Sequence, residues 1–395
     1  MTTDSSHIQI RSLYKVFGAD PGSVMPYVRE GMDKQELLET HGHVLALRDI
    51  DLTVETGSIQ VVMGLSGCGK STLVRHVNRL IEPTEGTVEV DGQDVCTLDR
   101  AALQGLRRHR VSMVFQHFAL FPHRTVLENV RYGVQMQGVA RPECDERAQR
   151  WIDRVALTGY EASYPHELSG GMQQRVGLAR ALATEAEILL MDEAFSALDP
   201  LIRADMQTLL LELQRELHRT ILFVTHDLDE AITIGDRIAI LRDGVVVQNG
   251  DSQEIVLQPS DDYISNFTRN INRGRVIQVG SIMEPAEEGA PSAEPDADEG
   301  IPSDMVLEEA LSRVVDASGE EAPVVDVEGR TVGAISVERM VHALAGDTAN
   351  GEEERGEAEA EDAEGAGTGS GAAAAAGDEA EAAQEKPAKG EPSKD

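Results

Sequence analysis

Residues 64–72, GLSGCGKST, directly follow the apolar run SIQVVM (58–63) and open a stretch with helical periodicity. They fit the phosphate-loop pattern G-x-x-x-x-G-K-[ST] in the strand–loop–helix context that the pattern requires. Backbone N–H groups of such a loop surround phosphate oxygens, and the following helix N-terminus favours negative charge. We therefore predict a nucleotide site in which Lys70 reaches the β- and γ-phosphates and Ser71 ligates Mg²⁺. The residues expected to bind the nucleotide are Gly64, Ser66, Gly67, Cys68, Gly69, Lys70, Ser71 and Thr72.

Two carboxylates end a second apolar run, in which ILLM (188–191) leads into Asp192 and Glu193. A hard cation beside phosphates takes oxygen ligands, so Asp192 is expected to serve Mg²⁺, usually through water. Glu193 is expected to polarise the water that attacks the γ-phosphate. Acidic residues at a strand end often act only as caps, but after a phosphate loop the catalytic interpretation is favoured.

Apolar runs alternate with helical patterns along most of the chain. Strands are expected at 7–13, 45–54, 58–63, 110–115, 188–192 and 220–225, with a helix at 70–80. This alternation predicts an α/β domain, residues 1–272, built on a largely parallel and covered sheet. A helical subdomain is predicted at about 117–185, and the segment from Gly18 to Gly42, which contains the helix-like stretch 25–41, is predicted to be an insertion.

A second unit is expected at 273–346, with helices at 305–316 and 337–345 and strands at 322–327 and 331–336. A Pro/Glu/Ala-rich acidic stretch at 284–300 interrupts this small α+β unit. Residues 347–395 consist mainly of Glu, Ala and Gly. Because such a segment buries too little apolar area to offset the entropy of ordering, it is predicted to be a disordered acidic tail.

The composition excludes some function classes. Asp and Glu total 70 against 35 Lys and Arg, a formal net charge of −35, so a nucleic-acid partner is not expected. Only Lys15, Lys34 and Lys70 precede residue 347, and the remaining basic residues of that part are arginines. Surplus carboxylates with few lysines favour a halophilic protein from a cytosol of high salt, where the Debye length is about 3 Å near 1 M. The alternative is a mesophilic protein with an acidic tail.

Cysteine usage and the N-terminus indicate the compartment. Cys68, Cys96 and Cys144 show no paired spacing, so neither a disulfide framework nor a zinc site is expected, and the compartment is predicted to be reducing. The N-terminus lacks a basic region followed by an apolar one, and no apolar run approaches the roughly 18 residues of a membrane span. We expect a soluble, intracellular chain.

The stretch LSGGMQQR (168–175) resembles the signature of ABC ATPases and precedes the Asp192 strand, as it does in that family. The resemblance implies a P-loop ABC ATPase core that binds ATP and Mg²⁺. It also implies that Ser169, Gly170 and Gly171 bind the γ-phosphate held by the phosphate loop of another subunit. A head-to-tail homodimer with two composite sites follows from this resemblance, whereas the triplet alone would usually be a helix cap.

Further positions match the family. Gln116 in VFQHFALFPH resembles the loop glutamine that senses Mg²⁺ and γ-phosphate and faces the permease. Asp199 closes SALD (196–199), which resembles the loop that crosses the dimer interface. His226 resembles the switch histidine that contacts γ-phosphate and orients Glu193. For adenine stacking the resemblance implies an aromatic residue after the first strand; Phe17 fits best, with Tyr14 as the weaker candidate.

Within the family, the insertion, the phosphate-loop region and MDEAFSALDPLIRADMQ (191–207) resemble the ATPase subunit of glycine betaine/proline betaine importers over roughly residues 7–270. The stretch PVVDVEGRTVGAISVERM (323–340) is similar to a CBS module, which such importers often carry as a pair. Ser336 and Glu338 stand where nucleotide-binding CBS modules tend to have Ser/Thr and Asp. Ligand binding and a purely dimerising role both remain open.

The resemblance implies an ATPase subunit that drives osmoprotectant import through separate permease subunits and, indirectly, an extracellular solute-binding protein. Its expected place is peripheral, at the cytoplasmic face of the membrane. Import of another solute, such as methionine, would keep the mechanism and change the cargo. A soluble ABC ATPase acting on DNA or ribosomes would show a coiled coil, a second cassette or a basic arm, and none is visible in the sequence.

Overall fold

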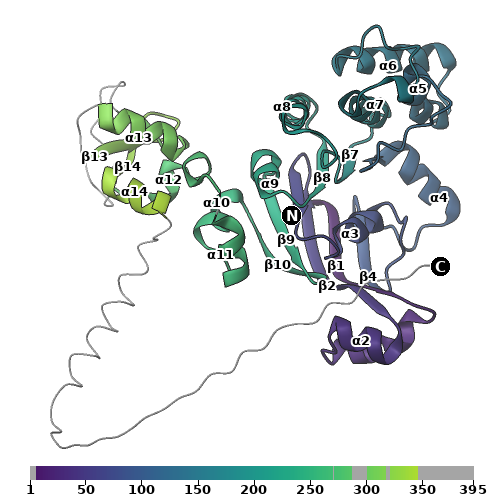
Figure 1. Cartoon of the computed structure of the whole chain (residues 1–395), viewed down its shortest axis with the longest axis horizontal. Helices are drawn as coiled ribbons and strands as arrows, with labels where there is room; N and C mark the ends of the chain where they lie inside the picture. Colours follow the sequence, from purple (N-terminus) through teal and green to yellow (C-terminus); the bar gives the residue numbers. More distant parts are fainter. Residues whose placement is uncertain (1–5, 270, 287–299, 317–320, 346–395) are drawn as a thin grey trace, which may run out of the picture. The chain divides into compact units, whose positions relative to one another are not determined.

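The larger sheet of the computed structural model has six strands. The structure describes residues 6–269, 271–286, 300–316 and 321–345, which Figure 1 draws as helices, strands and coloured loops. Neighbouring strands in the order β10-β9-β3-β8-β7-β6 are parallel, except that β10 is antiparallel to β9. β3, β7 and β8 are buried along their whole length, as strands covered on both faces must be. The predicted α/β fold is confirmed. The strands are β3 (Ile59–Met63), β6 (Val111–Val114), β7 (Ile188–Asp192), β8 (Thr220–Thr225), β9 (Arg237–Arg242) and β10 (Val245–Gly250).

A second sheet is antiparallel, in the order β2-β1-β4-β5. Ile10, Ile50 and Val88 from this sheet share one buried cluster with Val62 of β3, so the two sheets enclose a common core. β1 runs beyond the predicted strand, and β4 and β5 were not predicted. The strands are β1 (Ser6–Phe17), β2 (Val44–Glu55), β4 (Glu85–Val90) and β5 (Gln93–Asp94).

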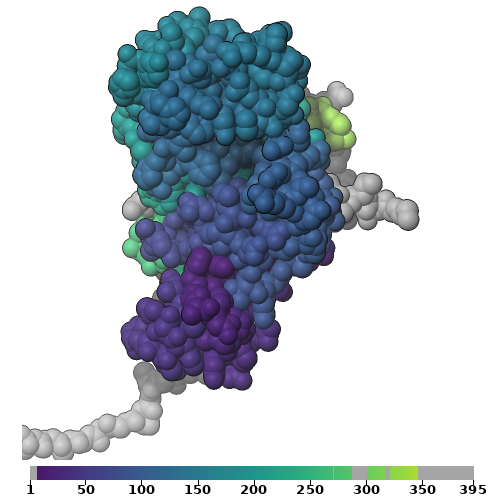
Figure 2. Space-filling model, turned by 90° about the vertical axis from the view of Figure 1, so that its right-hand side faces the viewer, coloured from purple at the N-terminus to yellow at the C-terminus, as the bar shows by residue number. Residues whose placement is uncertain are grey.

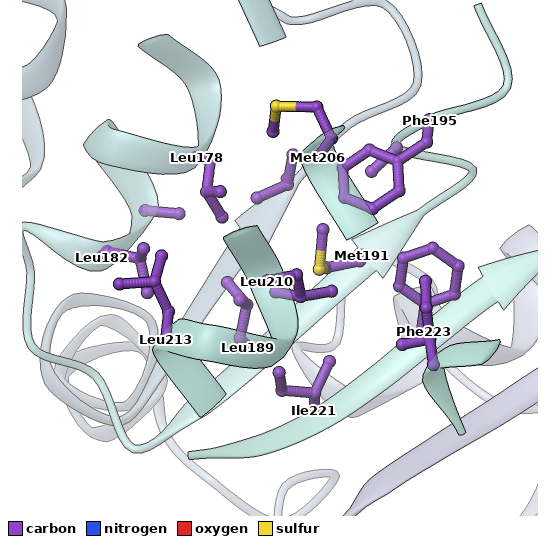
Figure 3. Packing of buried hydrophobic residues seen from close by; sticks show 14 of the residues in the cluster. Leu178, Leu182, Leu189, Met191, Phe195, Met206, Leu210, Leu213, Ile221 and Phe223 are labelled. Atoms are coloured by element: carbon purple, nitrogen blue, oxygen red, sulfur yellow. The ribbon is translucent and has the colours of Figure 1, made fainter. Parts of the chain in front are cut away.

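Helices cover the larger sheet. On one face, Leu178 and Leu182 of one helix and Met206 and Leu210 of another pack over the strands (Figure 3). The rings of Phe195 and Phe223 lie beside this cluster with centroids 5.5 Å apart. The helices of the core are α3 (Lys70–Val77), α4 (Arg100–Gly105), the π-helical η2 (Leu106–Arg110), α8 (Pro200–Leu217), α9 (Leu228–Ile234), α10 (Ser252–Leu257) and α11 (Asp262–Thr268).

Between β6 and β7 the described chain is helical, in the range for which a helical subdomain is predicted. Thr125 and Glu128 form a reciprocal capping box at the start of the first of these helices. Buried Val130, Ala148 and Trp151 join the cluster that continues onto the sheet. The elements are α5 (Val126–Met136), α6 (Arg141–Arg154), η3 (Pro165–Glu167) and α7 (Gly170–Leu182).

The insertion between β1 and β2 holds two helices and a short 3₁₀ turn where the sequence indicated one helix-like stretch. Gly31, with φ +100°, breaks the helical path, and Asp33 then caps the second helix by accepting from Glu36 N at 2.8 Å. Met25 and Leu37 pack against Val16 in a separate small cluster. The elements are η1 (Pro21–Val24), α1 (Met25–Arg29) and α2 (Lys34–His41).

The C-terminal part of the described chain is a small α+β unit on a sheet ordered β11-β14-β13-β12. The first strand of this sheet lies at the start of the predicted acidic stretch and another directly follows that stretch, whereas residues 287–299 and the predicted tail lie outside the described residues. Its elements are η4 (Arg273–Arg275), α12 (Val279–Ile282), β11 (Glu284–Pro285), β12 (Ile301–Pro302), α13 (Leu307–Asp316), β13 (Glu321–Val325), β14 (Thr331–Ser336) and α14 (Val337–Ala345). No helix among the described residues combines the length and apolarity of a membrane span.

Candidate nucleotide-binding site

The phosphate loop lies between buried β3 and the start of α3. Gly64 has φ +147°, and a Cβ there would lie 2.1 Å from the carbonyl oxygen of Leu241, so only glycine fits. The loop folds around Lys70, whose Nζ donates to the carbonyl oxygens of Gly64 at 2.8 Å and Leu65 at 3.0 Å. The lysine is 3% exposed. An ammonium group is thus held inside a ring of backbone groups at the helix N-terminus.

Asp192 meets the phosphate loop from the end of β7. Ser71 Oγ donates to Asp192 Oδ1 at 2.6 Å, and Arg75 Nη2 donates to Oδ2 at 2.9 Å. The carboxylate is almost fully buried, so these two partners offset the cost of removing it from water. A hydroxyl and a carboxylate oxygen side by side suit Mg²⁺, which keeps several water ligands and binds through one or two protein oxygens beside phosphates.

Glu193 is the point at which the predicted catalytic residues meet. Its Oε1 lies 3.7 Å from Lys70 Nζ, and Gln116 Nε2 donates to its Oε2 at 3.0 Å. His226 Nδ1 lies 3.6 Å from the same Oε2 and has a side chain 54% exposed. The backbone of Glu193 has φ +47°, a left-handed conformation that costs a non-glycine residue about 1 kcal/mol or more. The structure therefore brings Lys70, Gln116 and His226 to one carboxylate.

A pocket of about 340 Å³ opens between the phosphate loop and the start of β2. Phe17, which the resemblance favours for adenine stacking, lines it, whereas Tyr14 is not among the lining residues. Lys15 Nζ lies 4.8 Å from the centroid of the Phe17 ring. The pocket is lined by Phe17, Lys34, Val44, Leu45, Ala46, Ser66, Gly67, Gly69, Lys70, Ser71, Thr72, Gln116 and Glu193. Of the predicted phosphate-loop residues, Gly64 and Cys68 lie behind this surface.

The signature residues lie outside this pocket. Ser169 caps α7 by accepting from Met172 N at 3.3 Å, and Ser169 and Gly170 are exposed. Gly171 is buried against α8, where a Cβ would lie 2.5 Å from Ile202 Cγ2. A Cβ on Gly170 would meet no atom closer than 3.9 Å, so packing within the described chain does not require this glycine.

Asp199 also lies outside the pocket. It caps α8 by accepting from Ile202 N at 3.1 Å and is exposed. At the other end of the same loop, Ser196 Oγ donates to the carbonyl oxygen of Glu193 at 2.9 Å. The loop therefore connects an exposed helix cap directly to the backbone of the predicted catalytic residue.

Three positively charged residues near the site were not singled out from the sequence. Arg75 contacts Asp192, and Lys34 lines the pocket. Arg203 of α8 donates to Asp227 Oδ2 at 2.8 Å and to the carbonyl oxygen of Leu198 at 3.3 Å. The scarcity of lysine could have pointed to Lys34, but no local pattern marks either arginine.

A buried carboxyl group lies behind the His226 loop. Glu230 is 4% exposed and accepts from Gln207 Nε2 at 3.3 Å and from the hydroxyl of Thr225. Burial raises the pKa of Glu230 above its ordinary value. Among the described residues, no group of three or more His, Cys, Asp or Glu is placed to hold a metal ion by itself.

Comparison with known proteins shows which family has this sequence and site. Residues 47–196 match the family described as ABC transporter. The chain is 45% identical over 337 residues to the glycine betaine/proline betaine transport system ATP-binding protein ProV of Escherichia coli (strain K12), covering 85% of this chain and 82% of ProV. It is 48% identical over 289 residues to the glycine betaine transport ATP-binding protein OpuAA of Bacillus subtilis (strain 168), covering 73% and 69%.

The chain is also similar to an ATP-binding protein of another import system and to a solved structure of an ATP-binding cassette. The methionine import ATP-binding protein MetN 2 of Enterococcus faecalis is 41% identical over 259 residues, 66% of this chain and 75% of that protein. A solved structure of a dimeric ATP-binding cassette in a post-hydrolysis state, bound to ADP and Pi, is similar with a TM-score of 0.53 and 31% identity. That match covers 62% of this chain and 98% of the cassette.

Proposed function

The chain belongs to the family of ABC transporter ATP-binding subunits, and we propose that it hydrolyses ATP to drive import of glycine betaine, proline betaine or a related quaternary amine. The observation that carries the proposal is the assembly of Lys70, Gln116 and His226 around Glu193 in a chain that matches ProV over 337 residues. The solute crosses the membrane through a separate permease. The similarity to betaine systems is longer and higher in identity than that to the methionine system.

The described side chains divide the chemistry of ATP hydrolysis between them. Lys70 neutralises charge on the β- and γ-phosphates, and Glu193 polarises the attacking water. Gln116 and His226, on the other side of the Glu193 carboxylate, orient it. Ser71, Gln116 and Asp192 are the residues that would hold Mg²⁺, which when bound would supply positive charge against the phosphates.

We place the second half of each ATP site on a partner subunit. Ser169 and Gly170 are exposed and outside their own chain's pocket, and Gly170 has no packing role among the described residues. A glycine at a helix N-terminus lets a phosphate approach backbone N–H groups. The similar cassette is dimeric in its post-hydrolysis state, which supports a homodimer with two composite sites. Asp199, exposed at the cap of α8, completes this interface.

The permease is proposed to bind in a second cavity, of about 450 Å³, between η2 and helices α5 and α7. Leu80 and Met136 line it and are 51% and 43% exposed, and Figure 2 shows this surface hollowed between the blue and teal parts of the chain. Phe115 and Ala119 reach the cavity from the segment that carries Gln116. Movement of a docked permease would therefore reach Glu193 through one loop.

Copurification tests the docking surface. Met136→Glu should lose association with the permease, because a carboxylate would be buried against an apolar partner. Tyr160→Glu is the matched control, since Tyr160 is 44% exposed on the helical subdomain but does not line the cavity. If Met136→Glu still copurified with the permease, this cavity would not be the docking surface.

We also propose the division of the chain into domains, which follows the boundaries expected from the sequence. We assign residues 1–272 to the ATPase, with its helical subdomain at about 117–185, and 273–346 to a CBS-like module. Ser336 Oγ accepts from Arg339 N at 3.2 Å and so caps α14. A stoichiometry of two ATP per chain would assign nucleotide binding to the module, whereas one ATP per chain would leave it a dimerising role.

Glu193→Gln tests the catalytic assignment. It should keep the affinity for ATP–Mg²⁺ within about threefold and lower kcat by roughly 10²-fold or more, as expected for loss of a group that activates water. Lys70→Ala should instead lose nucleotide affinity, because its charge contacts the phosphates directly. Turnover by Glu193→Gln close to that of the wild type under saturating Mg²⁺ would overturn the assignment.

Reconstitution tests the cargo. In proteoliposomes that contain this chain and its permease, glycine betaine with its binding protein should stimulate ATP hydrolysis and solute uptake together. Methionine with a methionine-binding protein should do neither. Stimulation by methionine with its binding protein, and not by glycine betaine, would show that the solute is an amino acid. The proposed ATPase mechanism would be unchanged. The peripheral location at the cytoplasmic face follows from the same assembly.

A further inference from the structure

The three lysines of the described chain gather at one place. Lys70 and Lys34 line the nucleotide pocket, and Lys15 lies over the ring of Phe17, which lines it as well. Lys70 belongs to the phosphate loop, whereas Lys34 belongs to the insertion between β1 and β2. On the rest of the described surface the permanent cations are arginines. We propose that Lys34 is a nucleotide-contacting residue that adds a second ammonium group against the polyphosphate chain of ATP.

The three lysines differ in how many partners their ammonium groups already have within the described chain. Lys70 is enclosed by carbonyl groups of its loop. Lys15 Nζ donates to the carbonyl oxygen of Glu82 at 2.7 Å, and burial lowers its pKa. Lys34 Nζ reaches only the carbonyl oxygen of Gly67, at 3.5 Å, and forms no ion pair among the described residues. Its ammonium group is free to donate to an anion at the rim of the phosphate loop.

The position of Lys34 is built into the insertion. It is the first residue of α2, directly after the Asp33 cap. Leu37, one turn later, is fully buried against Val16 and Leu45, so α2 is fixed on the two strands that begin the pocket. Arg48 of β2 donates to the carbonyl oxygen of Met32, just before the cap. The stem of Lys34 therefore starts from a rigid element beside Gly67.

The chemistry selects phosphates as the ligand. The ammonium of Lys34 lies 3.5 Å from the carbonyl oxygen of Gly67, in the loop whose N–H groups are proposed to bind phosphate oxygens. A net charge of −35 makes an added anion site costly without local cations. A lysine is a compact point charge with three donors, suited to several phosphate oxygens without fixed geometry. This inference rests on the proposed function, because it assigns a further residue to the same ATP site.

The test measures ATP affinity by isothermal titration on the full-length chain carrying Glu193→Gln, which prevents turnover, at a KCl concentration where the wild type hydrolyses ATP. Adding Lys34→Gln should raise the Kd for ATP about three- to tenfold. Lys34→Arg should stay within about twofold, because it retains the charge. Thermal unfolding without nucleotide should be unchanged in both, with a smaller ATP-induced rise in Tm for Lys34→Gln.

Arg29→Gln is the matched control. It removes one positive charge from the same insertion, but Arg29 pairs with Glu85 at 2.5 Å and does not line the pocket. The inference is overturned if Lys34→Gln binds ATP as tightly as its parent, if Lys34→Arg is as weak as Lys34→Gln, or if Arg29→Gln weakens ATP equally. Failure of the parent protein to bind ATP would instead contradict the proposed function.

Discussion

At the scale of single residues, the site is organised around one carboxylate with a divided environment. Glu193 has an ammonium group near one oxygen and an amide and an imidazole near the other. These partners come from the phosphate loop, from the segment after β6 and from the segment after β8. We expect a change at any of the three segments to alter the orientation of Glu193. Its left-handed backbone is held by a backbone hydrogen bond, in which Glu193 N donates to the carbonyl oxygen of Val224 at 3.0 Å.

His76 gives a prediction about pH. It is fully buried in α3, its Nδ1–H donates to the carbonyl oxygen of Thr72 at 2.6 Å, and burial, with a smaller effect of Lys15, lowers its pKa from 6.5 to about 4. Between these two values the unfolded chain binds more protons than the folded chain. The free energy of unfolding should therefore fall by up to about 1.4 kcal/mol per pH unit as the pH drops from 6.5 towards 4.

His76→Gln isolates this contribution. Glutamine can still donate to the carbonyl of Thr72 but cannot titrate. Denaturant unfolding at several pH values should show a shallower loss of stability for the variant between pH 6.5 and 4, and the same slope as the wild type above pH 7. Equal slopes for both proteins throughout would show that His76 does not titrate on unfolding in this range.

The residues of the site were predictable to different degrees. Lys70, Asp192 and Glu193 stand in local patterns whose chemistry is readable from neighbouring residues. Arg75 could not be predicted to contact Asp192, because 117 positions separate the two and only the parallel arrangement of β3 and β7 brings them together. Gly170 and Gly171 look alike in sequence, and only the packing of Ile202 shows that the second is needed by the fold.

At the scale of elements, fully buried strands were predictable because β3, β7 and β8 read as continuous apolar runs. The hairpins β4–β5 and β9–β10 were missed, although each turns on an Asp-Gly pair. Asp91 and Gly92 have φ values of +52° and +71°, and Asp243 and Gly244 have +51° and +83°. Asp-Gly between strands is a strong hairpin signal. β4, β5 and β10 are partly exposed strands with mixed polar residues, and so each hairpin lacks a clear apolar run on at least one side of its turn.

Helix α8 contacts both loops beside Glu193, the one that contains Leu198 and the one that contains Asp227. Arg203 holds both Asp227, next to His226, and the carbonyl oxygen of Leu198, next to Asp199. Arg203→Leu should lower kcat for ATP about tenfold and leave the KM within about twofold, because it loosens the positioning of His226 and not the phosphate loop. Steady-state ATP hydrolysis measures both constants.

Arg154→Leu is the control for this variant. Arg154 forms the other ion pair of α8, with Glu216 near its C-terminal end, far along the helix from the two loops. The Arg154→Leu variant should keep the wild-type kcat for ATP. Equal losses of kcat in both variants, or a loss in Arg203→Leu that matches its loss of folded protein, would show that Arg203 acts only on the stability of α8.

At the scale of the whole molecule, activity should require two chains. Gly170→Asp is chosen because an acidic residue in the first turn of α7 suits the helix and repels a phosphate. A dimer that pairs one Lys70→Ala subunit with one Gly170→Asp subunit keeps one intact composite site, whereas either homodimer has none. Differently tagged subunits, purified as a pair, should hydrolyse ATP at up to half the wild-type rate. Activity in the Gly170→Asp homodimer would contradict a site completed in trans.

Net charge is the other property of the whole chain, and it predicts a dependence on ionic strength. The formal charge is −35, and only part of it lies in the tail, since residues 347–395 carry 15 acidic and 4 basic side chains. Repulsion among the remaining carboxylates opposes folding and dimerisation. Raising KCl from about 0.1 M to about 1 M shortens the Debye length from about 10 Å to about 3 Å and screens this repulsion. ATPase activity and Tm of the full-length chain should therefore rise together, with activity increasing at least about threefold.

Sorbitol at the osmolality of 1 M KCl separates screening from hydration, because it changes water activity without adding ions. It should restore little activity at about 0.1 M KCl, whereas NaCl should restore about as much as KCl, since screening depends on ionic strength and not on the identity of the cation. Equal activity at both KCl concentrations would contradict the screening account. Recovery in sorbitol alone would assign the effect to hydration of the compact state, and recovery with KCl but not NaCl would assign it to a specific potassium site.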